Sequence, residues 1–456
     1  MLLNYFVENF KSFGTAQKFS MIPTRNQNHR DHVFEENTYK ALKMSAIYGG
    51  NASGKSNFVE SIFHLRNIVL AGEVRRILSP CYFKLKDLGQ DTRFEVEIGI
   101  GDRMFLYAVS VNTVTGEVKN EYIYENRGGS LHLFFDIDRN SSNIEFNNKL
   151  ICDANKERFK IYHSDLSSSQ LLLTRLAKAT TEMDEMFEVA SLIYGWFSKL
   201  VIINPHMSPA NLYEQFCHSD LDNGIKSIIE LIRSFDTGIT NYKYEHLTNE
   251  QFNNVLKNSP SLLPADIVDV QNEIMKVTPH LNLEIFIDGK LYRATKKESE
   301  IHVELVMFEH CGNSEPLFSF HEESDGTKRL LELINVLYSS QFEDRVFIID
   351  EIERSLHANL TTEFLRAFLE LSRKAAQLII TTHETSLMDL SLLRPDEIWL
   401  LDRNSSGMSS FTCLSEYVKR NDKVIDKDYL DGRYGGISTI VKVYKGDGFS
   451  DGETLC

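Results

Sequence analysis

Eight consecutive residues have the types and the spacing needed to bind the phosphates of a nucleotide. Residues 49–56 read GGNASGKS, which fits the pattern G-x-x-x-x-G-K-S. Glycines in such a loop let successive backbone N–H groups and the next helix N-terminus face phosphate oxygens, while Lys55 reaches the β- and γ-phosphates and Ser56 binds Mg²⁺. A glycine turn that only begins a helix is the alternative. We predict an ATP and Mg²⁺ site with the binding residues Gly49, Asn51, Gly54, Lys55, Ser56 and Asn57.

An apolar segment that ends in two acidic residues is the second feature that could do chemistry. Residues 346–351 read VFIIDE, so Asp350 stands at the end of a predicted buried strand and Glu351 follows it. Asp350 can hold the water shell of Mg²⁺, and Glu351 can orient or deprotonate the water that attacks a phosphate. We therefore predict Ser56 and Asp350 as metal ligands, and Glu351 and Lys55 as catalytic residues. An exposed acidic strand end without function is the alternative.

Two further segments place polar residues at a helix start and at a strand end. Ser324 and Gly326 belong to the sequence SDGT, directly before a predicted helix at 328–337 whose N-terminus would favour an anion. His383 follows the apolar segment 378–382, and we predict that it hydrogen-bonds a γ-phosphate as a third catalytic residue. Taken singly, Ser324 also fits a simple helix N-cap, and His383 a histidine satisfied at a strand end.

The spacing of apolar residues predicts the elements that must position these groups. Segments 2–6 and 44–48 are predicted strands, and a helix follows the glycine loop. Apolar residues at every second position between 83 and about 124 predict an antiparallel sheet. Helical patterns extend from about 150 to 277, and strands at 281–287 and 301–308 follow, with a hairpin signal at 288–289. Beyond 329 helices alternate with buried strands, which predicts a parallel sheet and the α/β fold class.

The two parts of the predicted nucleotide site lie in opposite halves of the chain, so the nucleotide-binding domain is expected to be split in sequence. We predict that residues 1–150 form its first half, with the P-loop and an antiparallel β-subdomain. Residues 151–300 are predicted to form a mainly helical insertion or lid. Residues 301–456 are predicted to form the second half, which carries the SDGT segment, the acidic strand and His383.

Charge and cysteine content limit the classes of function. Lys and Arg number 49 against 65 Asp and Glu, and the net charge of −16 argues against a protein that coats nucleic acid or an anionic membrane. The six cysteines have no C-x-x-C spacing, which favours reduced thiols over a structural zinc site. A basic leader and a long apolar run are both missing from the sequence, so we expect a cytoplasmic protein.

The order of these motifs resembles that of the ABC-type ATPase heads of the SMC, RecF and OLD branch. Within that branch the sequence is most similar to phage-defence ATPases of about this size, typified by the ATPase subunit of the PARIS system. The resemblance rests on six segments. They are ENFKSFG (8–14), YGGNASGKSN (48–57), HEESDGTKRLL (321–331), FIIDEIERSLH (347–357), IITTHET (379–385) and YLDGRYGGI (429–437).

The resemblance implies roles for further residues. Ser324 and Gly326 would form the ABC signature, although this chain reads ESDGT where transporters read LSGGQ, which leaves the role of Asp325 open. Lys11 and Phe13 fall where related heads contact the base or ribose of the nucleotide. The resemblance also implies a homodimer, or a higher homo-oligomer, that completes its ATP sites between subunits.

The resemblance further implies an ATP-hydrolysing sensor or scaffold in a bacterial anti-phage system of the abortive-infection, toxin–antitoxin-like kind. Such a subunit holds a separately encoded effector, a TOPRIM-like nuclease, and releases it on a phage-encoded trigger. A DNA-repair ATPase of the RecF or SMC type is the alternative function, which the negative net charge disfavours. A structural oligomer that binds nucleotide without turnover is a third.

Overall fold

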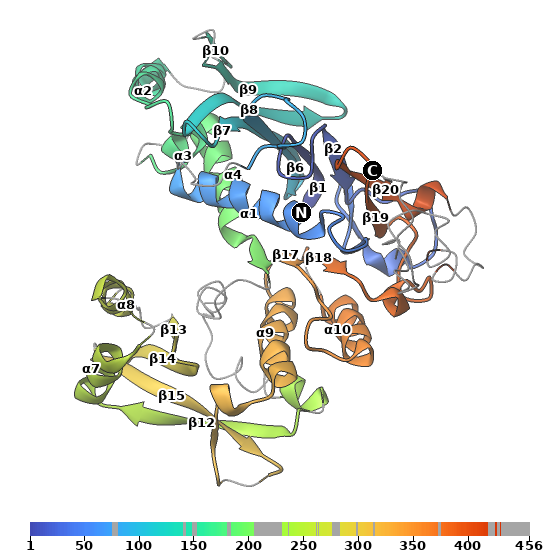
Figure 1. The fold of residues 1–456 in the computed structure, drawn as a ribbon. Coiled ribbons are helices and arrows are strands. Elements are labelled where there is room, and N and C mark those ends of the chain that lie inside the picture. The colour runs from blue at the N-terminus through green and yellow to red at the C-terminus, as the bar shows by residue number, and fades with distance from the viewer. Residues whose placement is uncertain are drawn as a thin grey trace, which may run out of the picture. The chain divides into compact units, whose positions relative to one another are not determined.

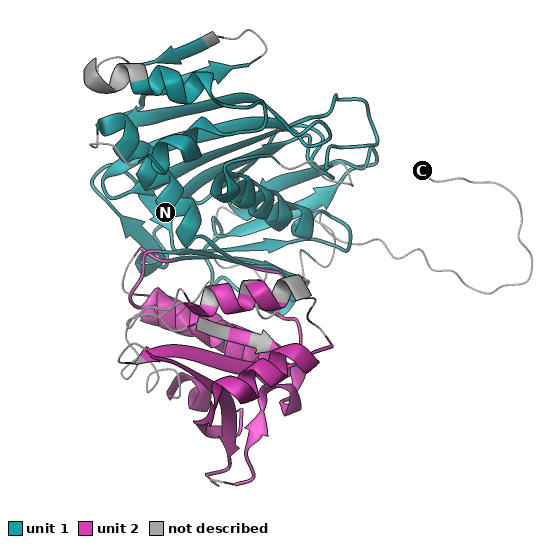
Figure 2. Cartoon of the chain, turned by 90° about the vertical axis from the view of Figure 1, so that its left-hand side faces the viewer, with its two compact units in different colours: residues 1–202, 345–351, 377–456 teal, residues 203–344, 352–376 magenta. Residues whose placement is uncertain are grey.

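The computed structural model describes residues 1–74, 81–139, 143–147, 153–179, 184–204, 230–235, 237–260, 262, 264–275, 283–297, 300–312, 315–372, 375–417, 425 and 429. The chain forms two compact units that alternate along the sequence (Figure 2). Unit 1 consists of residues 1–202, 345–351 and 377–456, and unit 2 of residues 203–344 and 352–376. These boundaries differ from the predicted divisions at 150 and 300, because strands near 346–349 and 377–382 complete a sheet with the N-terminal part.

A seven-stranded antiparallel sheet forms one layer of unit 1 (Figure 1). Phe94, Val96 and Ile98 are buried while the residues between them are not, so the predicted period-two pattern is confirmed. In sheet order the strands are β10 (Asn143–Phe146), β9 (Ser130–Asp138), β8 (Glu117–Arg127), β7 (Arg103–Asn112), β6 (Asp91–Ile100), β1 (Leu2–Glu8) and β2 (Gln17–Ser20).

A six-stranded sheet in unit 1 holds the predicted chemistry. Its neighbours β17, β18, β5 and β19 are parallel, and β20 is antiparallel to β19. In sheet order the strands are β11 (Val201–Ile203), β17 (Val346–Ile349), β18 (Gln377–Thr382), β5 (Met44–Tyr48), β19 (Ile398–Arg403) and β20 (Ser409–Cys413). Strands β5, β17 and β18 therefore end at one edge of the sheet, directly before Gly49, Asp350 and His383.

Helix α1 (Lys55–Ala71) begins at the glycine loop and lies along α3 (Leu172–Ala177) and α4 (Glu185–Lys199). Phe58, Ile62, Leu65 and Val69 recur at helical spacing and are all buried, as predicted. The helix ends at Gly72, whose positive φ of 80° lets its N–H reach the Ile68 carbonyl. Unit 1 also contains helix α2 (Asp153–Ser164), the two-stranded pair β3 (Val33–Glu35) and β4 (Lys40–Leu42), and a short 3-10 helix at Arg30–His32.

Unit 2 contains a five-stranded antiparallel sheet. It comprises β12 (Ile239–Leu247), β15 (Glu300–His310), β14 (Lys290–Lys297) and β13 (Leu283–Ile287), with β16 (Phe318–Ser319) paired to β15. Asp288 and Gly289 form the predicted hairpin turn with positive φ at both positions. The helices of this unit include α7 (Asn249–Asn258), α8 (Pro264–Met275), α9 (Asp325–Ser340) and α10 (Ala358–Leu371).

The prediction of helix from about 150 to 277 is wrong for β12. Tyr242 and Tyr244 of this strand pair with Phe308 and Val306 of β15, more than sixty positions further along the chain. A strand whose partner lies so far away gives only a weak local pattern, and aromatic residues fit both helices and strands. Among the helices that the structure describes, none has both the length and the apolar character needed to cross a bilayer.

Candidate functional site

The glycine loop has the backbone geometry that its sequence predicts. Gly54 has a φ of 113°, and a Cβ there would lie only 2.4 Å from Ser409 Oγ and 2.7 Å from Ser12 Oγ. Ser409 in β20 holds the loop, because its hydroxyl donates to the Ser53 carbonyl at 2.5 Å and its N–H donates to the Ser12 carbonyl at 2.8 Å. Glycine at this position therefore permits both the turn and the close approach of the neighbouring strand.

The Lys55 side chain folds back over the loop that precedes it. Its ammonium group donates to the carbonyls of Gly49 at 2.6 Å and Gly50 at 3.3 Å, and Nζ lies 3.3 Å from Nδ1 of His383. An ammonium can only donate, so Nδ1 of His383 accepts and the ring proton lies on Nε2. The structure thus brings together Lys55 and His383, two predicted residues that are far apart in sequence.

Thr381 organises the two acidic residues at the end of β17. Its hydroxyl donates to Asp350 Oδ1 and accepts the backbone N–H of Glu351 at 2.9 Å. The parallel pairing of Ile349 with Ile380 places Thr381 beside this strand end. Sequence reasoning missed Thr381, although its place two positions before His383 in the segment ITTH was the available signal.

Glu351 has a backbone conformation that glutamate rarely adopts. Its φ is 50°, in the left-handed region, which costs on the order of 1–3 kcal/mol for a residue with a side chain. Strained residues of this kind cluster at functional sites. The conformation is consistent with the predicted catalytic role of Glu351, and Asp350 beside it is buried.

The remaining predicted P-loop residues lie in and beside the loop. Ser56 is exposed in the first turn of α1, and Asn51 is exposed in the loop. The Asn57 amide donates to Ser12 Oγ at 2.8 Å, so its side chain faces the turn after β1. Sequence reasoning missed Ser53, whose buried Oγ has no hydrogen-bond partner within the described part of the chain.

A pocket of about 510 Å³ opens beside the first turns of α1. Lys11 lines it and forms an ion pair with Glu60 of α1. Burial lowers the pKa of His64 and raises the pKa of the Cys81 thiol, so both groups line the pocket in neutral form at pH 7. The pocket volume lies in the range of about 300–1,000 Å³ that is typical of small-molecule sites.

The prediction that Phe13 contacts the nucleotide is wrong for this structure. Phe13 is 0% exposed, and its ring stacks on Phe411 with centroids 5.8 Å apart. A side chain enclosed in the core has no free face for a base. Lys11 and Phe13 are two residues apart in a tight turn, so one side chain lines the pocket and the other enters the core.

The predicted signature residues lie in unit 2, at the start of α9. Ser324 is the N-cap, and its Oγ accepts the N–H of Thr327 at 3.1 Å. A Cβ on Gly326 would lie 2.9 Å from the Ser355 carbonyl, so glycine permits close contact between two backbone segments. The Asp325 side chain is exposed. Of the segment 429–437 that supports the resemblance, all but Tyr429 lies outside the described residues.

Comparison with known proteins gives one family match. A family model described as "AAA domain, putative AbiEii toxin, Type IV TA system" matches residues 216–389, which include Ser324, Asp350 and His383 but not the P-loop. No curated protein matches the chain.

Solved structures of SMC heads resemble the chain at low identity. The SMC head domain from Thermotoga maritima has 14% identity and a TM-score of 0.35, and the match covers 90% of this chain and 98% of that one. An SmcHead bound to the C-winged helix domain of ScpA has 12% identity and a TM-score of 0.42, with 92% and 99% covered. A Pyrococcus furiosus Smc head bound to the C-terminal domain of ScpA has 14% identity and a TM-score of 0.40, with 91% and 97% covered.

The fold and the site define the class of protein. The predicted α/β fold with an antiparallel subdomain is confirmed, and its P-loop joins a central strand to a helix. The structure is therefore that of an α/β protein with a P-loop, and residues 216–389 are similar to an AAA domain.

Proposed function

We propose that this chain binds and hydrolyses ATP as the sensor or scaffold subunit of a bacterial anti-phage defence system, where it holds and releases a separately encoded effector. The observation that carries the ATPase part is the meeting of Lys55, Asp350 and His383 at the carboxyl edge of three neighbouring parallel strands. Ligands of open parallel sheets bind at this edge.

The residues at this edge fit a nucleotide with Mg²⁺. The Ser56 hydroxyl and the Asp350 carboxylate are oxygen donors, the ligand type that Mg²⁺ prefers, and they would hold the ion, which supplies charge neutralisation at the phosphates. Lys55 would exchange its present carbonyl acceptors for phosphate oxygens. His383 has its ring proton on Nε2 in this structure, and it would donate that proton in a hydrogen bond to the γ-phosphate.

Glu351 is the proposed catalytic base, because it follows the metal-binding Asp350 at the strand end. Glu351→Gln keeps the size of the side chain and removes its negative charge. We expect this variant to bind ATP, to retain it, and to release almost no phosphate, whereas Glu353→Gln serves as a neighbouring control. Nucleotide retention and multiple-turnover phosphate release measure both steps. Wild-type turnover by Glu351→Gln would reject the assigned base, and an absence of turnover in the wild type would favour a nucleotide-bound structural oligomer.

A homodimer is proposed to complete the ATP site. Ser324 at the N-terminus of the sixteen-residue helix α9 is exposed, so a phosphate from a second chain can reach this helix start. Mixing Lys55→Ala chains with Ser324→Arg chains tests this arrangement. Each mixed dimer then holds one site with both lesions and one site with neither, so activity should partly recover. Absence of recovery at every mixing ratio would argue against a shared site.

The defence role is supported by the family description, which names a toxin of a Type IV toxin–antitoxin system. An ATPase that controls a separate effector, proposed to be a nuclease, should co-purify with the product of a neighbouring gene. Cells that carry the gene pair should resist phage, and the same pair with Lys55→Ala should not. The RecF- or SMC-type repair function is the second candidate, favoured by the likeness to SMC heads. Purification without a partner, together with tight, salt-dependent binding of duplex DNA in ATP, would support repair instead.

A further inference from the structure

Two histidines and an aspartate gather in the loop between β2 and β3, away from the P-loop. Potential ligand atoms of His29, Asp31 and His32 all lie within 4.8 Å of one another. Asp31 Oδ2 is 3.9 Å from His32 Nε2, and the two imidazole rings stack with centroids 4.8 Å apart. The cluster lies within unit 1.

In each imidazole ring, one nitrogen forms a hydrogen bond with a protein acceptor, and the other nitrogen is not used by that contact. Nδ1 of His32 lies 3.0 and 3.1 Å from the two carboxylate oxygens of Glu397, which is 0% exposed. Nε2 of His29 lies 3.0 Å from the Leu390 carbonyl, which can only accept. The proton of His29 is therefore on Nε2, and the carboxylate similarly favours a proton on Nδ1 of His32. Each ring then has one nitrogen with a lone pair, Nδ1 of His29 and Nε2 of His32.

A histidine that donates its second ring N–H to a carboxylate or a carbonyl is the usual arrangement at metal sites. Such a partner fixes both the tautomer and the direction of the ring. Here Glu397 and the Leu390 carbonyl occupy those positions for the two histidines.

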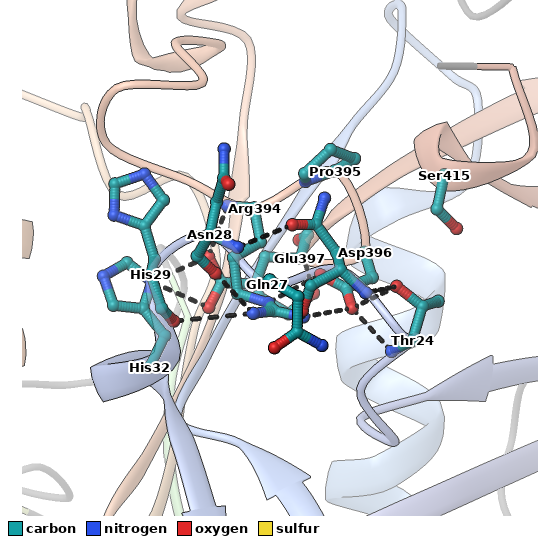
Figure 3. Close-up of polar contacts among 12 residues, drawn as sticks. Thr24, Gln27, Asn28, His29, His32, Arg394, Pro395, Asp396, Glu397 and Ser415 are labelled. Atoms are coloured by element: carbon teal, nitrogen blue, oxygen red, sulfur yellow. Dashed lines mark hydrogen bonds and ion pairs between the residues drawn. The ribbon is translucent and has the colours of Figure 1, made fainter. Parts of the chain in front are cut away.

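A second layer of contacts fixes the loop that carries these residues (Figure 3). The buried Arg394 donates to the carbonyls of Asn28 at 2.6 Å and Asn26 at 3.1 Å, and it pairs with Asp396 through two contacts of 2.8 Å. Asp396 in turn accepts the N–H of Thr24 at 2.6 Å and its hydroxyl at 2.7 Å. The loop is thus held at several points along its backbone and does not depend on the histidines alone.

We propose that His29, Asp31 and His32 bind a divalent transition-metal ion such as Zn²⁺, with water at the remaining position. Two imidazoles and one carboxylate suit Zn²⁺ and other divalent first-row transition metals far better than Mg²⁺. Metal–nitrogen distances of about 2.0–2.1 Å require ligand atoms roughly 3.3 Å apart. The present spacing of up to 4.8 Å must therefore contract by up to about 1.5 Å. The Asp31 side chain is 79% exposed and can rotate to complete the site.

This site is separate from the proposed ATP chemistry. The carbonyl of His32 accepts the N–H of Lys43 at 2.8 Å, so His32 lies directly before the start of β5. The P-loop follows the other end of β5, about 17 Å away for a five-residue strand. The ion would therefore fix the conformation of the loop between β2 and β3 and stabilise unit 1, without contacting the nucleotide.

Equilibrium dialysis and calorimetry with Zn²⁺ on nucleotide-free protein test the proposal, with Mg²⁺ as the hard-ion control. We expect one saturable Zn²⁺ equivalent and a higher thermal midpoint in Zn²⁺ than in Mg²⁺. His29→Ala and Asp31→Asn alter partly or fully exposed side chains, and each should weaken binding at least tenfold. His132→Ala, a change at an exposed histidine of β9, should leave it unchanged. Glu397→Gln should weaken binding about 10–100-fold, as loss of such a partner does elsewhere.

Co²⁺ distinguishes this site from the cysteines of the chain. Binding at the proposed site should give visible d–d bands without thiolate-to-metal charge transfer, and His29→Ala should remove these bands. The proposal fails if the wild type binds no Zn²⁺, if His29→Ala and Asp31→Asn bind it as the wild type does, or if the Co²⁺ spectrum shows thiolate ligation. None of these outcomes depends on ATP hydrolysis, so they also leave the proposed ATPase function untouched.

Discussion

The two edges of the six-stranded sheet carry polar residues of different character. At the carboxyl edge, Lys55 and His383 contact each other and loop carbonyls, and Ser56 is exposed beside them. At the amino edge, Arg394, Asp396 and Glu397 are all buried in a network of hydrogen bonds with the loop before β3. Polar groups that a ligand can reach must exchange partners easily, whereas buried charges persist only when they are fully paired.

The two edges of this sheet therefore serve different properties: the carboxyl edge serves activity, and the amino edge serves stability. Changes at the carboxyl edge should reduce nucleotide chemistry with little effect on folding. Changes at the amino edge should destabilise the fold while the surviving folded molecules still bind ATP. Four experiments test this separation.

Lys55→Ala should have the largest effect, and on activity alone. Loss of the ammonium removes the positive charge expected at the β- and γ-phosphates, and removal of one such group typically reduces kcat by about 10²–10³. ATP affinity should also fall, while the thermal midpoint without nucleotide stays near that of the wild type. Lys18→Ala, a change at a lysine that lies over the Phe6 ring, is the control and should retain activity. Normal ATP turnover by the Lys55→Ala protein would show that the carboxyl edge of the sheet does not carry the nucleotide chemistry.

Arg394→Met should lower the free energy of unfolding by about 3–5 kcal/mol, because it leaves the buried Asp396 without its charged partner. Denaturant unfolding measures this loss. Arg366→Met removes an exposed arginine whose partner is Glu363, and it should change stability by less than about 0.5 kcal/mol. If folded Arg394→Met protein bound ATP much more weakly than the wild type, the two edges would not be separable.

Thr381→Val should affect both properties moderately, because Thr381 supports the active edge from within the sheet. The change leaves the Asp350 carboxylate and the Glu351 N–H each without one hydrogen bond, at a cost of about 1–3 kcal/mol. We also expect a reduced kcat, because Asp350 and Glu351 both lose their hydrogen bonds to the Thr381 hydroxyl. Thr361→Val is the matched control: its hydroxyl is buried and has no partner within the described residues, so this change should be neutral or stabilising. Unchanged turnover in Thr381→Val would exclude a positioning role.

The smallest effect is expected at Asp396, whose titration should make the stability of the fold depend on acidic pH. Burial alone would raise the pKa of Asp396, but hydrogen bonds from Arg394 and Thr24 lower it overall, below its ordinary value of 3.8. A lowered pKa in the folded state adds stability above pH 3.8, and this contribution is lost as the pH falls through the folded-state pKa. Asp396→Asn should therefore show a flatter decline of stability below that pH than the wild type. Asp102→Asn, an exposed change, should follow the wild type, and identical slopes in all three proteins would refute the assigned pairing.

How far the site could be predicted depends on whether its parts are local in the sequence. Lys55, Gly54 and the start of α1 are neighbours, and the chemistry of a glycine loop before a helix needs little else, so the P-loop was predictable. The strands before Asp350 and His383 were predictable from their apolar runs. Their meeting with Lys55 follows from the parallel order of β17, β18 and β5.

The sequence by itself determined the P-loop, the α/β class and the candidate catalytic residues, because contiguous patterns encode them. Only the tertiary structure decided that Lys11 lines a pocket while Phe13 is buried, since both are compatible with the same tight turn. It also decided that β12 is a strand, and that Glu397 meets His32 across 365 positions of sequence. A buried ion pair or a sheet register is set by partners far along the chain, and no local spacing of residues specifies which distant partner will complete it.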